Sequence, residues 1–341
     1  MQNSLNPDTQ VIDSFFQNLG SSIKTKVYTR NNQEIAILYS TADSGDVCVS
    51  QLYAEPIGTC LSNYIYEDSA TNHIDWLLDY SEDIVKNILE KPDDISQWGF
   101  LYNFVLSITS AKGIQPLFFP LVELITKCYH TKMTDATGAL LRSDFLVEQA
   151  HLYKDLYFRI RNLVQTYLDV DTLGSDTPYL HYQSNPEPVL QFGTLTFESI
   201  PNYPAESYLG DVLYPNTPND IVNYVFSRCI ISNIELKRCE YCKQYFVYPS
   251  RGNAKYCHRV YRNTGKTCKQ LAFTSTREKV KENPIEKEYE RAYKMYYARM
   301  LSGRMTKEEF KRWADHARQL RKDCYEDKIS AETFIKLMKN P

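Results

Sequence analysis

The sequence predicts an α+β fold that is mostly α. Three observations carry this prediction: alternating segments near the N-terminus, a series of amphipathic segments after them, and a second helical region toward the C-terminus. Apolar residues make up 43% and charged residues 24% of the 341 residues, as in ordinary globular proteins. We expect a small N-terminal sheet, a helical bundle, a β-hairpin module and C-terminal helices, in that order.

The N-terminal sheet is predicted over residues 24–55. Polar residues alternate there with β-branched or aromatic ones in three runs, KVYTR, EIAILYS and DVCVSQLYAE, separated by turn residues. A further short strand is expected over 191–199. Turns should follow it, because Pro201, Pro204 and Gly210 break the pattern.

The helical bundle is predicted from apolar residues that recur every three or four positions over 73–89, 95–108 and 143–168. Pro120 lies inside another apolar stretch. Because proline lacks an N–H and clashes with the preceding turn, we expect a helix to begin or kink there and to run to Tyr129.

A later helix is predicted to lead into the cysteine-rich part of the chain. Thr217 is a suitable N-cap and Pro218 a suitable first helical residue. The apolar stripe that follows extends to Ile234, so we expect this helix to lead directly to Cys239.

The C-terminal end is predicted to be helical throughout. Thr306 and Glu309 have the spacing of a capping box, which marks the start of a helix. The phrase GRMTKEEF at 303–310 recurs loosely as DKISAETF at 327–334. We interpret the two phrases as a pair of related helix starts.

The charge distribution divides the chain. Residues 1–227 hold 12 basic and 28 acidic residues, whereas residues 228–341 hold 27 basic and 14 acidic ones. We therefore expect an acidic α+β domain of unknown role over 1–227, a cysteine module over 228–282 and a basic helical segment over 283–341. Opposite charges could also neutralise one another across an internal interface.

Four of the nine cysteines have the spacing of a metal site, C-x2-C-x14-C-x10-C. Thiolates bind Zn²⁺ tetrahedrally, and four of them leave no position open for water, so we expect a structural Zn²⁺ on Cys239, Cys242, Cys257 and Cys268. His258 is an alternative ligand in place of one thiolate. The segment between the pairs should be a β-hairpin, with 245–248 as one arm and 250–253 as its turn.

The same features indicate the compartment. An odd number of cysteines with four at metal spacing fits reduced thiols better than disulfides, so we expect a cytoplasmic protein. The N-terminal residues MQNSLNPDTQ have neither the basic nor the apolar part of an export signal. No apolar run approaches the ~20 residues that span a bilayer, so no membrane association is expected.

The basic part of the chain, residues 228–341, predicts a polyanionic partner such as nucleic acid. Residues 228–282 hold 13 basic and 4 acidic residues, an excess of nine, and a tetrathiolate zinc site offsets about two of these charges. Lysine and arginine bind phosphates through counterion release, and interleaved tyrosines can stack on bases. We therefore predict nucleic-acid binding by Arg251, Lys255, Arg259, Arg262, Lys266 and Lys269.

Two alternatives stay open. The first is a protein-interaction adaptor whose zinc finger is purely structural and whose basic module binds an acidic protein surface. The second is an enzyme within residues 1–227, although no nucleophile, general base or cofactor loop is recognisable there. The run NTGKT at 263–267 is similar to the end of a phosphate-binding loop, but Val260 stands where that loop requires its first glycine.

The cysteine module also resembles a known family. The run R-C-x-x-C-x-x-x-F, followed by Y-C and T-C-K, is similar to the C-terminal zinc finger of uncharacterised Gram-positive bacterial proteins, well over 230–275 and more loosely over 276–338. It is more distantly similar to CGNR-type zinc fingers. That resemblance implies a DNA-binding regulator with an α-rich N-terminal domain. The chain lacks the Cys-Gly-Asn-Arg tetrapeptide, since Lys269 and Gln270 follow Cys268.

Overall fold

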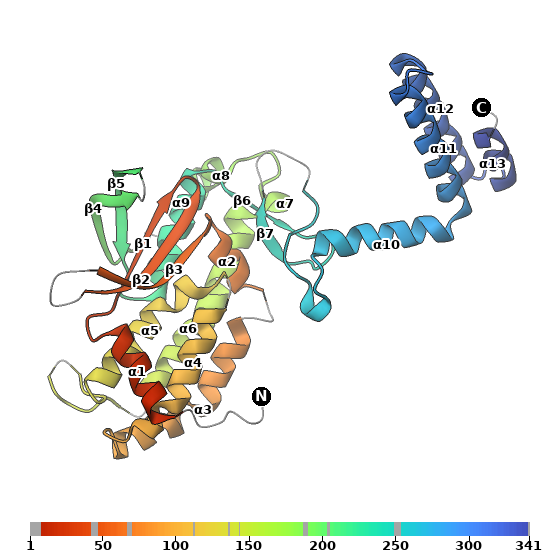
Figure 1. The fold of residues 1–341 in the computed structure, drawn as a ribbon. Helices are drawn as coiled ribbons and strands as arrows, with labels where there is room; N and C mark the ends of the chain where they lie inside the picture. Colours follow the sequence, from red (N-terminus) through yellow and green to blue (C-terminus); the bar gives the residue numbers. More distant parts are fainter. Residues whose placement is uncertain are drawn as a thin grey trace. The chain divides into compact units, whose positions relative to one another are not determined.

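The structure is a computed structural model that describes residues 8–41, 47–66, 70–111, 113–135, 137–142, 144–186, 190–202, 205–248 and 254–339. The chain forms two compact units, Met1–Lys255 and Tyr256–Pro341, and the division falls between the second and third cysteines of the metal motif. Helices predominate, and an antiparallel sheet lies in the first unit (Figure 1). The predicted class, α+β and mostly α, is confirmed.

The sheet has five strands in the order β3-β2-β1-β5-β4. Every neighbouring pair is antiparallel, and β1 occupies the centre because it pairs with β2 on one side and with β5 on the other. The strands are β1 (Lys24–Arg30), β2 (Gln33–Thr41), β3 (Val47–Pro56), β4 (Thr194–Asn202) and β5 (Ala205–Tyr214). The three runs of the sheet predicted over 24–55 are thus β1 to β3.

The prediction for the segment after β4 was wrong. We expected turns there, but β5 forms and completes the sheet. Pro204, which lies outside the described residues, falls between the two strands, and Gly210 lies within β5 opposite Glu198. Pairing with both β1 and β4 therefore overrides the local turn signals.

Helices supply the rest of the first unit. They are α1 (Thr9–Leu19), α2 (Thr59–Tyr64), α3 (Ala70–Glu90), the 3₁₀ helix η1 (Ile95–Trp98), α4 (Gly99–Ser110), α5 (Gln115–His130), α6 (Phe145–Leu163), the π-helical turn η2 (Val164–Leu168), α7 (Val170–Leu173), α8 (Pro178–Ser184) and α9 (Pro218–Ile231). The predicted helices over 73–89, 95–108 and 143–168 correspond to α3, to η1 with α4, and to α6 with η2. Helix α5 begins five residues before Pro120, at Gln115.

The core of the first unit lies between the helices and one face of the sheet. It holds large side chains that are almost completely excluded from water, such as Tyr64, Trp98, Phe118 and Tyr153. The rings of Phe118 and Tyr153 stack at 4.9 Å between centroids. Burial of this kind stabilises the fold by about 1.5–3 kcal/mol for each large apolar side chain.

A buried carboxylate connects β2 to the start of α2. Glu34 is 1% exposed and accepts hydrogen bonds from the Tyr53 hydroxyl (2.8 Å) and from the backbone N–H groups of Gly58 (2.9 Å) and Cys60 (2.6 Å). Burial raises the pKa of Glu34 to about 7, although these hydrogen bonds oppose the shift. Gly58 has φ +89°, and a Cβ there would lie 3.1 Å from the Cys229 Sγ, so only glycine fits this turn.

Helix α9 begins as predicted and ends earlier than predicted. Thr217 is its N-cap, and the Asp220 carboxylate accepts a hydrogen bond from the Thr217 N–H at 2.9 Å. We expected the helix to lead directly to Cys239, but it ends at Ile231. Asn233 adopts φ +51°, which terminates the helix, and the strand β6 (Glu235–Arg238) follows before the first cysteine.

The second unit contains the 3₁₀ helix η3 (Arg262–Thr264) and the helices α10 (Cys268–Glu282), α11 (Pro284–Leu301), α12 (Lys307–Tyr325) and α13 (Ala331–Lys339). Helix α12 begins with the predicted capping box of Thr306 and Glu309. Helix α13 begins after Ser330, whose hydroxyl accepts from the Thr333 N–H at 3.2 Å. The two repeated phrases are therefore both helix starts, as predicted. None of the helices in the described part of the chain is long and apolar enough to span a membrane.

Candidate metal centre

The first cysteine pair lies on the turn of a two-stranded hairpin. Strand β6 pairs antiparallel with β7 (Tyr245–Tyr248), and Cys239 and Cys242 lie between them. The Cys239 N–H donates to the Gln244 carbonyl (2.9 Å) and the Lys243 N–H to the Cys239 carbonyl (2.8 Å). These two bonds close a tight turn that presents both thiols. Strand β7 is therefore the predicted arm at 245–248, but its partner precedes the cysteines; residues 250–253 lie outside the described residues.

The hairpin is docked onto the helical part of the first unit. The Tyr245 hydroxyl donates to Asp169 Oδ2 at 2.6 Å, and Arg238 Nε donates to the Tyr245 hydroxyl at 2.9 Å. Asp169 also forms a parallel bridge with Leu236 on β6. Burial and the bond to Asp169 raise the pKa of Tyr245 to about 12, so its hydroxyl keeps the proton that it donates at neutral pH.

The second cysteine pair lies in the second unit. Cys257 is 1% exposed and lies in an irregular segment, whereas Cys268, also 1% exposed, is the first residue of α10. A capping box starts this helix: the Gln270 N–H donates to the Thr267 hydroxyl (3.3 Å), and the Thr267 N–H donates to the Gln270 side chain (2.9 Å). Sequence reasoning missed this start, although the pattern T-x-x-Q is a recognised signal for one.

The thiols of Cys239, Cys242, Cys257 and Cys268 come together. Their Sγ atoms all lie within 4.8 Å of one another, and three of the four residues are buried while Cys242 is half-buried. This group could hold a metal ion. His258, the alternative ligand, is exposed, and the group of four close ligand atoms does not include it.

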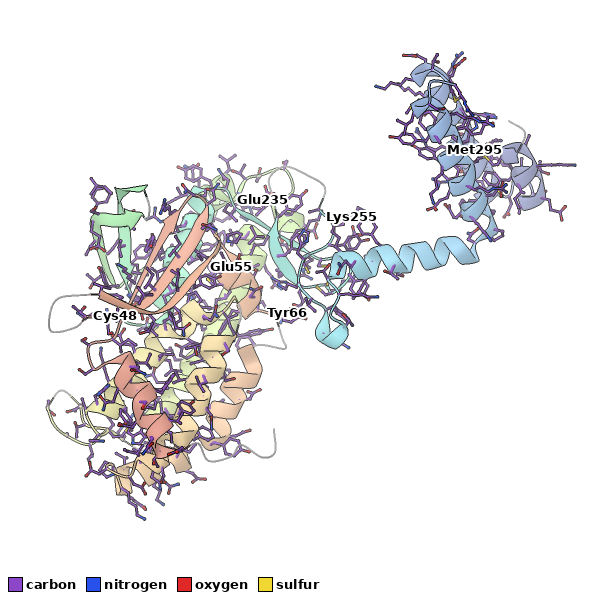
Figure 2. All side chains as sticks on the ribbon, in the orientation of Figure 1. Cys48, Glu55, Tyr66, Glu235, Lys255 and Met295 are labelled. Atoms are coloured by element: carbon purple, nitrogen blue, oxygen red, sulfur yellow. The ribbon has the colours of Figure 1, made fainter. Side chains whose placement is uncertain are left out.

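The cations predicted to bind nucleic acid differ in their surroundings. Lys255 is exposed and forms an ion pair with Glu240 at 3.3 Å, and Arg259 is half-buried. Arg251 lies outside the described residues. In Figure 2, Lys255 and Glu235, which begins β6, are labelled on the first unit.

Three further cations lie close together in the chain between Tyr261 and the first turn of α10. Arg262, Lys266 and Lys269 are all exposed. The Arg262 guanidinium lies 5.2 Å from the centroid of the Tyr261 ring. Within the described part of the chain, none of the three cations forms an ion pair with a carboxylate.

Part of the chain matches a known protein family. A family model described as a family of unknown function (DUF6076) matches residues 209–340. The match begins in β5 and includes all four cysteines and the helices of the second unit, but it covers less than half of the chain. No curated protein and no solved structure matches the sequence.

Proposed function

We propose that residues 228–282 form a zinc module that binds nucleic acid and that its zinc is structural. The proposal extends to a DNA-binding regulator, as the resemblance to CGNR-type fingers implies, acting in a reducing cytoplasm. The single observation that carries it is a group of three exposed cations without an ion pair, Arg262, Lys266 and Lys269, in the stretch of chain that leads into the first turn of α10.

The donor set supports zinc as the metal. A tetrahedral Zn²⁺ with Zn–S bonds of about 2.3 Å needs sulfur atoms about 3.8 Å apart, and the four Sγ atoms lie within 4.8 Å of one another. Four thiolates would fill the coordination sphere, so the ion would organise the backbone and would not activate a water molecule.

The exposed cations support nucleic acid as the partner. Each lysine or arginine that neutralises a phosphate releases a counterion, so binding by this surface should depend steeply on salt. Aromatic rings lie among the cations: Tyr261 is half-buried beneath Arg262 and Tyr256 is half-buried next to Cys257. Such rings can stack on bases without sequence preference.

A salt titration tests this proposal. We expect the full-length protein to bind a generic DNA duplex with an affinity that falls as salt rises. The combined substitution Arg262→Gln, Lys266→Gln, Lys269→Gln should weaken binding and lower the slope of log affinity against log salt by about three, roughly one for each lost phosphate contact. Fluorescence anisotropy at several salt concentrations measures both the affinity and the slope.

The matched control removes the same charge from the C-terminal helices. Arg304, Lys307 and Lys336 are exposed, and none of them forms an ion pair among the described residues. The triple change Arg304→Gln, Lys307→Gln, Lys336→Gln should leave the slope nearly unchanged. If the control variant lowered the slope as much as the substitution of Arg262, Lys266 and Lys269, these three residues would not be the binding surface. An affinity that is independent of salt, or no binding, would favour the protein-interaction adaptor.

A further inference from the structure

A second basic site lies in the first unit, apart from the residues predicted to bind nucleic acid. A pocket of about 280 Å³ opens between the end of α6, the end of β6 and the turn after Cys242. Three cations line it, Arg161, Arg238 and Lys243, together with the side-chain amides of Gln165 and Gln244. No carboxylate is among its lining residues.

Two of the three cations, Arg161 and Lys243, have no carboxylate partner among the described residues. Arg238 is partly neutralised, since its Nε lies 3.8 Å from Asp169 Oδ2 and its guanidinium lies 5.0 Å from the centroid of the Tyr245 ring. These contacts hold Arg238 in place at the wall of the pocket. Arg161 and Lys243 form no ion pair with any residue that the structure describes, and both are exposed. The pocket therefore has an excess of about two positive charges.

The backbone of Lys243 gives a second, independent reason to look for a ligand. Lys243 has φ +64°, in the left-handed region, because the turn that presents the two thiols requires it. A side chain in this conformation costs roughly 1–2 kcal/mol, which glycine would avoid. A lysine at this position is explained if its side chain contributes to function, because strained residues concentrate at functional sites.

We propose that this pocket binds a phosphate group. A phosphate monoester carries a charge of about −1.5 to −2 at pH 7, which matches the two unneutralised cations. Arginine presents a planar fork of donors to phosphate oxygens, and lysine and amide groups can complete the set. The volume lies just below the range of ligand pockets, about 300–1,000 Å³, so the pocket has room for a phosphate group together with part of the molecule that carries it.

The phosphate could belong to a nucleic-acid backbone or to a free phosphorylated small molecule. None of the pocket residues belongs to the surface proposed to bind nucleic acid. The phosphate site therefore stands whether or not the proposed function does, and the two are tested separately.

The test uses the full-length protein with two pocket variants and one control. Arg161→Gln and Lys243→Gly each remove one cation from the pocket, and Lys154→Gln removes an exposed cation from the same helix as Arg161. Inorganic phosphate is the first probe, titrated calorimetrically at constant ionic strength maintained with chloride. We expect both pocket variants to bind phosphate roughly tenfold more weakly than the wild type and the control, because each loses a charge-assisted hydrogen bond.

Lys243→Gly separates a binding role from a structural one. Because glycine relieves the left-handed strain, this variant should melt at or above the wild-type temperature and keep its full metal content while it loses phosphate affinity. A lower melting temperature or a loss of metal, with unchanged phosphate affinity, would mean that Lys243 serves the turn alone and would overturn the proposal.

A duplex of generic sequence is the second probe and identifies the source of the phosphate. If the pocket variants weaken duplex binding more than Lys154→Gln does, the ligand is a backbone phosphate. If they weaken the binding of inorganic phosphate and leave duplex binding unchanged, the ligand is a free phosphate ester. If neither probe distinguishes the pocket variants from the control, the pocket is not a phosphate site.

Discussion

The two units of this protein exclude water from their cores to different degrees. In the first unit the largest side chains, including Trp98 and Tyr64, are completely buried. In the second unit the largest aromatic residues, Trp313 and Tyr296, each keep 8% of their surface exposed. The difference follows from size, because a small unit has more surface for each buried residue and can bury a smaller fraction of its chain.

The second unit compensates with specific aromatic contacts. The rings of Tyr296 and Trp313 stack at 4.3 Å, and the Arg321 guanidinium lies 4.2 Å from the centroid of the Tyr289 ring. Its described core is a short set of buried residues: Ala292, Tyr296, Phe310, Trp313, Ala314, Ala317, Cys324, Phe334 and Met338. Each of these side chains therefore carries a larger share of the stability of its unit than a core residue of the first unit does.

The largest expected effect comes from the four cysteines, where the proposed metal would hold an irregular segment of the chain in place. Cys239→Ser should abolish binding of the proposed zinc, since structural zinc contributes about 10–16 kcal/mol to the folding of small metal modules. We expect no metal equivalent in the purified variant. Backbone amides over 256–268 should exchange rapidly with solvent, while those of α5 and α6 stay protected.

Metal analysis and hydrogen exchange measure these two results. Cys48→Ser is the matched control, because Cys48 is an exposed cysteine on β3, outside the group of four. A Cys239→Ser variant that retains one full equivalent of zinc would refute the proposed ligand set. Slow exchange over 256–268 in metal-free protein would show that the segment folds without the ion.

The next effect compares the two cores directly. Phe118→Ala and Trp313→Ala each remove a large aromatic side chain, at a cost of about 3–5 kcal/mol. The first unit should remain folded with a lower unfolding temperature, whereas the second unit should lose most of its helical protection because its total stability is of similar size. Hydrogen exchange resolved by segment measures the protection of each unit in the two variants.

Phe158→Ala provides the control for this pair, since Phe158 is 62% exposed on α6 and should change the unfolding free energy by less than about 0.5 kcal/mol. If Trp313→Ala left α11 and α12 fully protected, the second unit would have more stability in reserve than its small core implies.

The smallest of the three effects depends on pH and concerns the first unit. The folded pKa of Glu34 is about 7, above its ordinary value of 4.5, so the folded state binds this proton more tightly than the unfolded state. The stabilisation of the folded state by this proton is fully present below pH 4.5 and is lost as the pH rises through 7. Relative to Glu34→Gln, wild-type protein should therefore lose about 3 kcal/mol of unfolding free energy across that window.

Urea unfolding at a series of pH values measures the difference between the two proteins. Glu55→Gln is the control, because Glu55 lies opposite Glu34 on β3 but is exposed. A difference between wild type and Glu34→Gln that stays constant from pH 4.5 to 8 would show that Glu34 titrates normally in the folded state.

Features set by neighbouring residues could be predicted from the sequence. The starts of α9, α12 and α13 depend on caps within three or four residues, at Thr217, Thr306 and Ser330. The cysteine cluster was also predictable, because the turn that presents Cys239 and Cys242 is local.

Features that depend on distant partners could not be predicted. Strand β5 forms because β1 and β4 supply its hydrogen bonds, and its own glycine and the preceding proline argue against a strand. The phosphate pocket is also nonlocal. Arg161 lies on α6 and Lys243 follows the second cysteine, and no spacing in the sequence indicates that they line one cavity.

The central place of β1 in the sheet has a consequence for the order of folding during synthesis. Val27 pairs with Leu213, about 190 residues later in the chain. At roughly 5–20 residues per second, a ribosome needs about 10–40 s to make the segment between them. For that time β1 has no partner on the side that β5 later covers, and an unpaired strand edge is a template for association with other chains. Nascent chains of this protein should therefore depend on chaperones until β5 emerges.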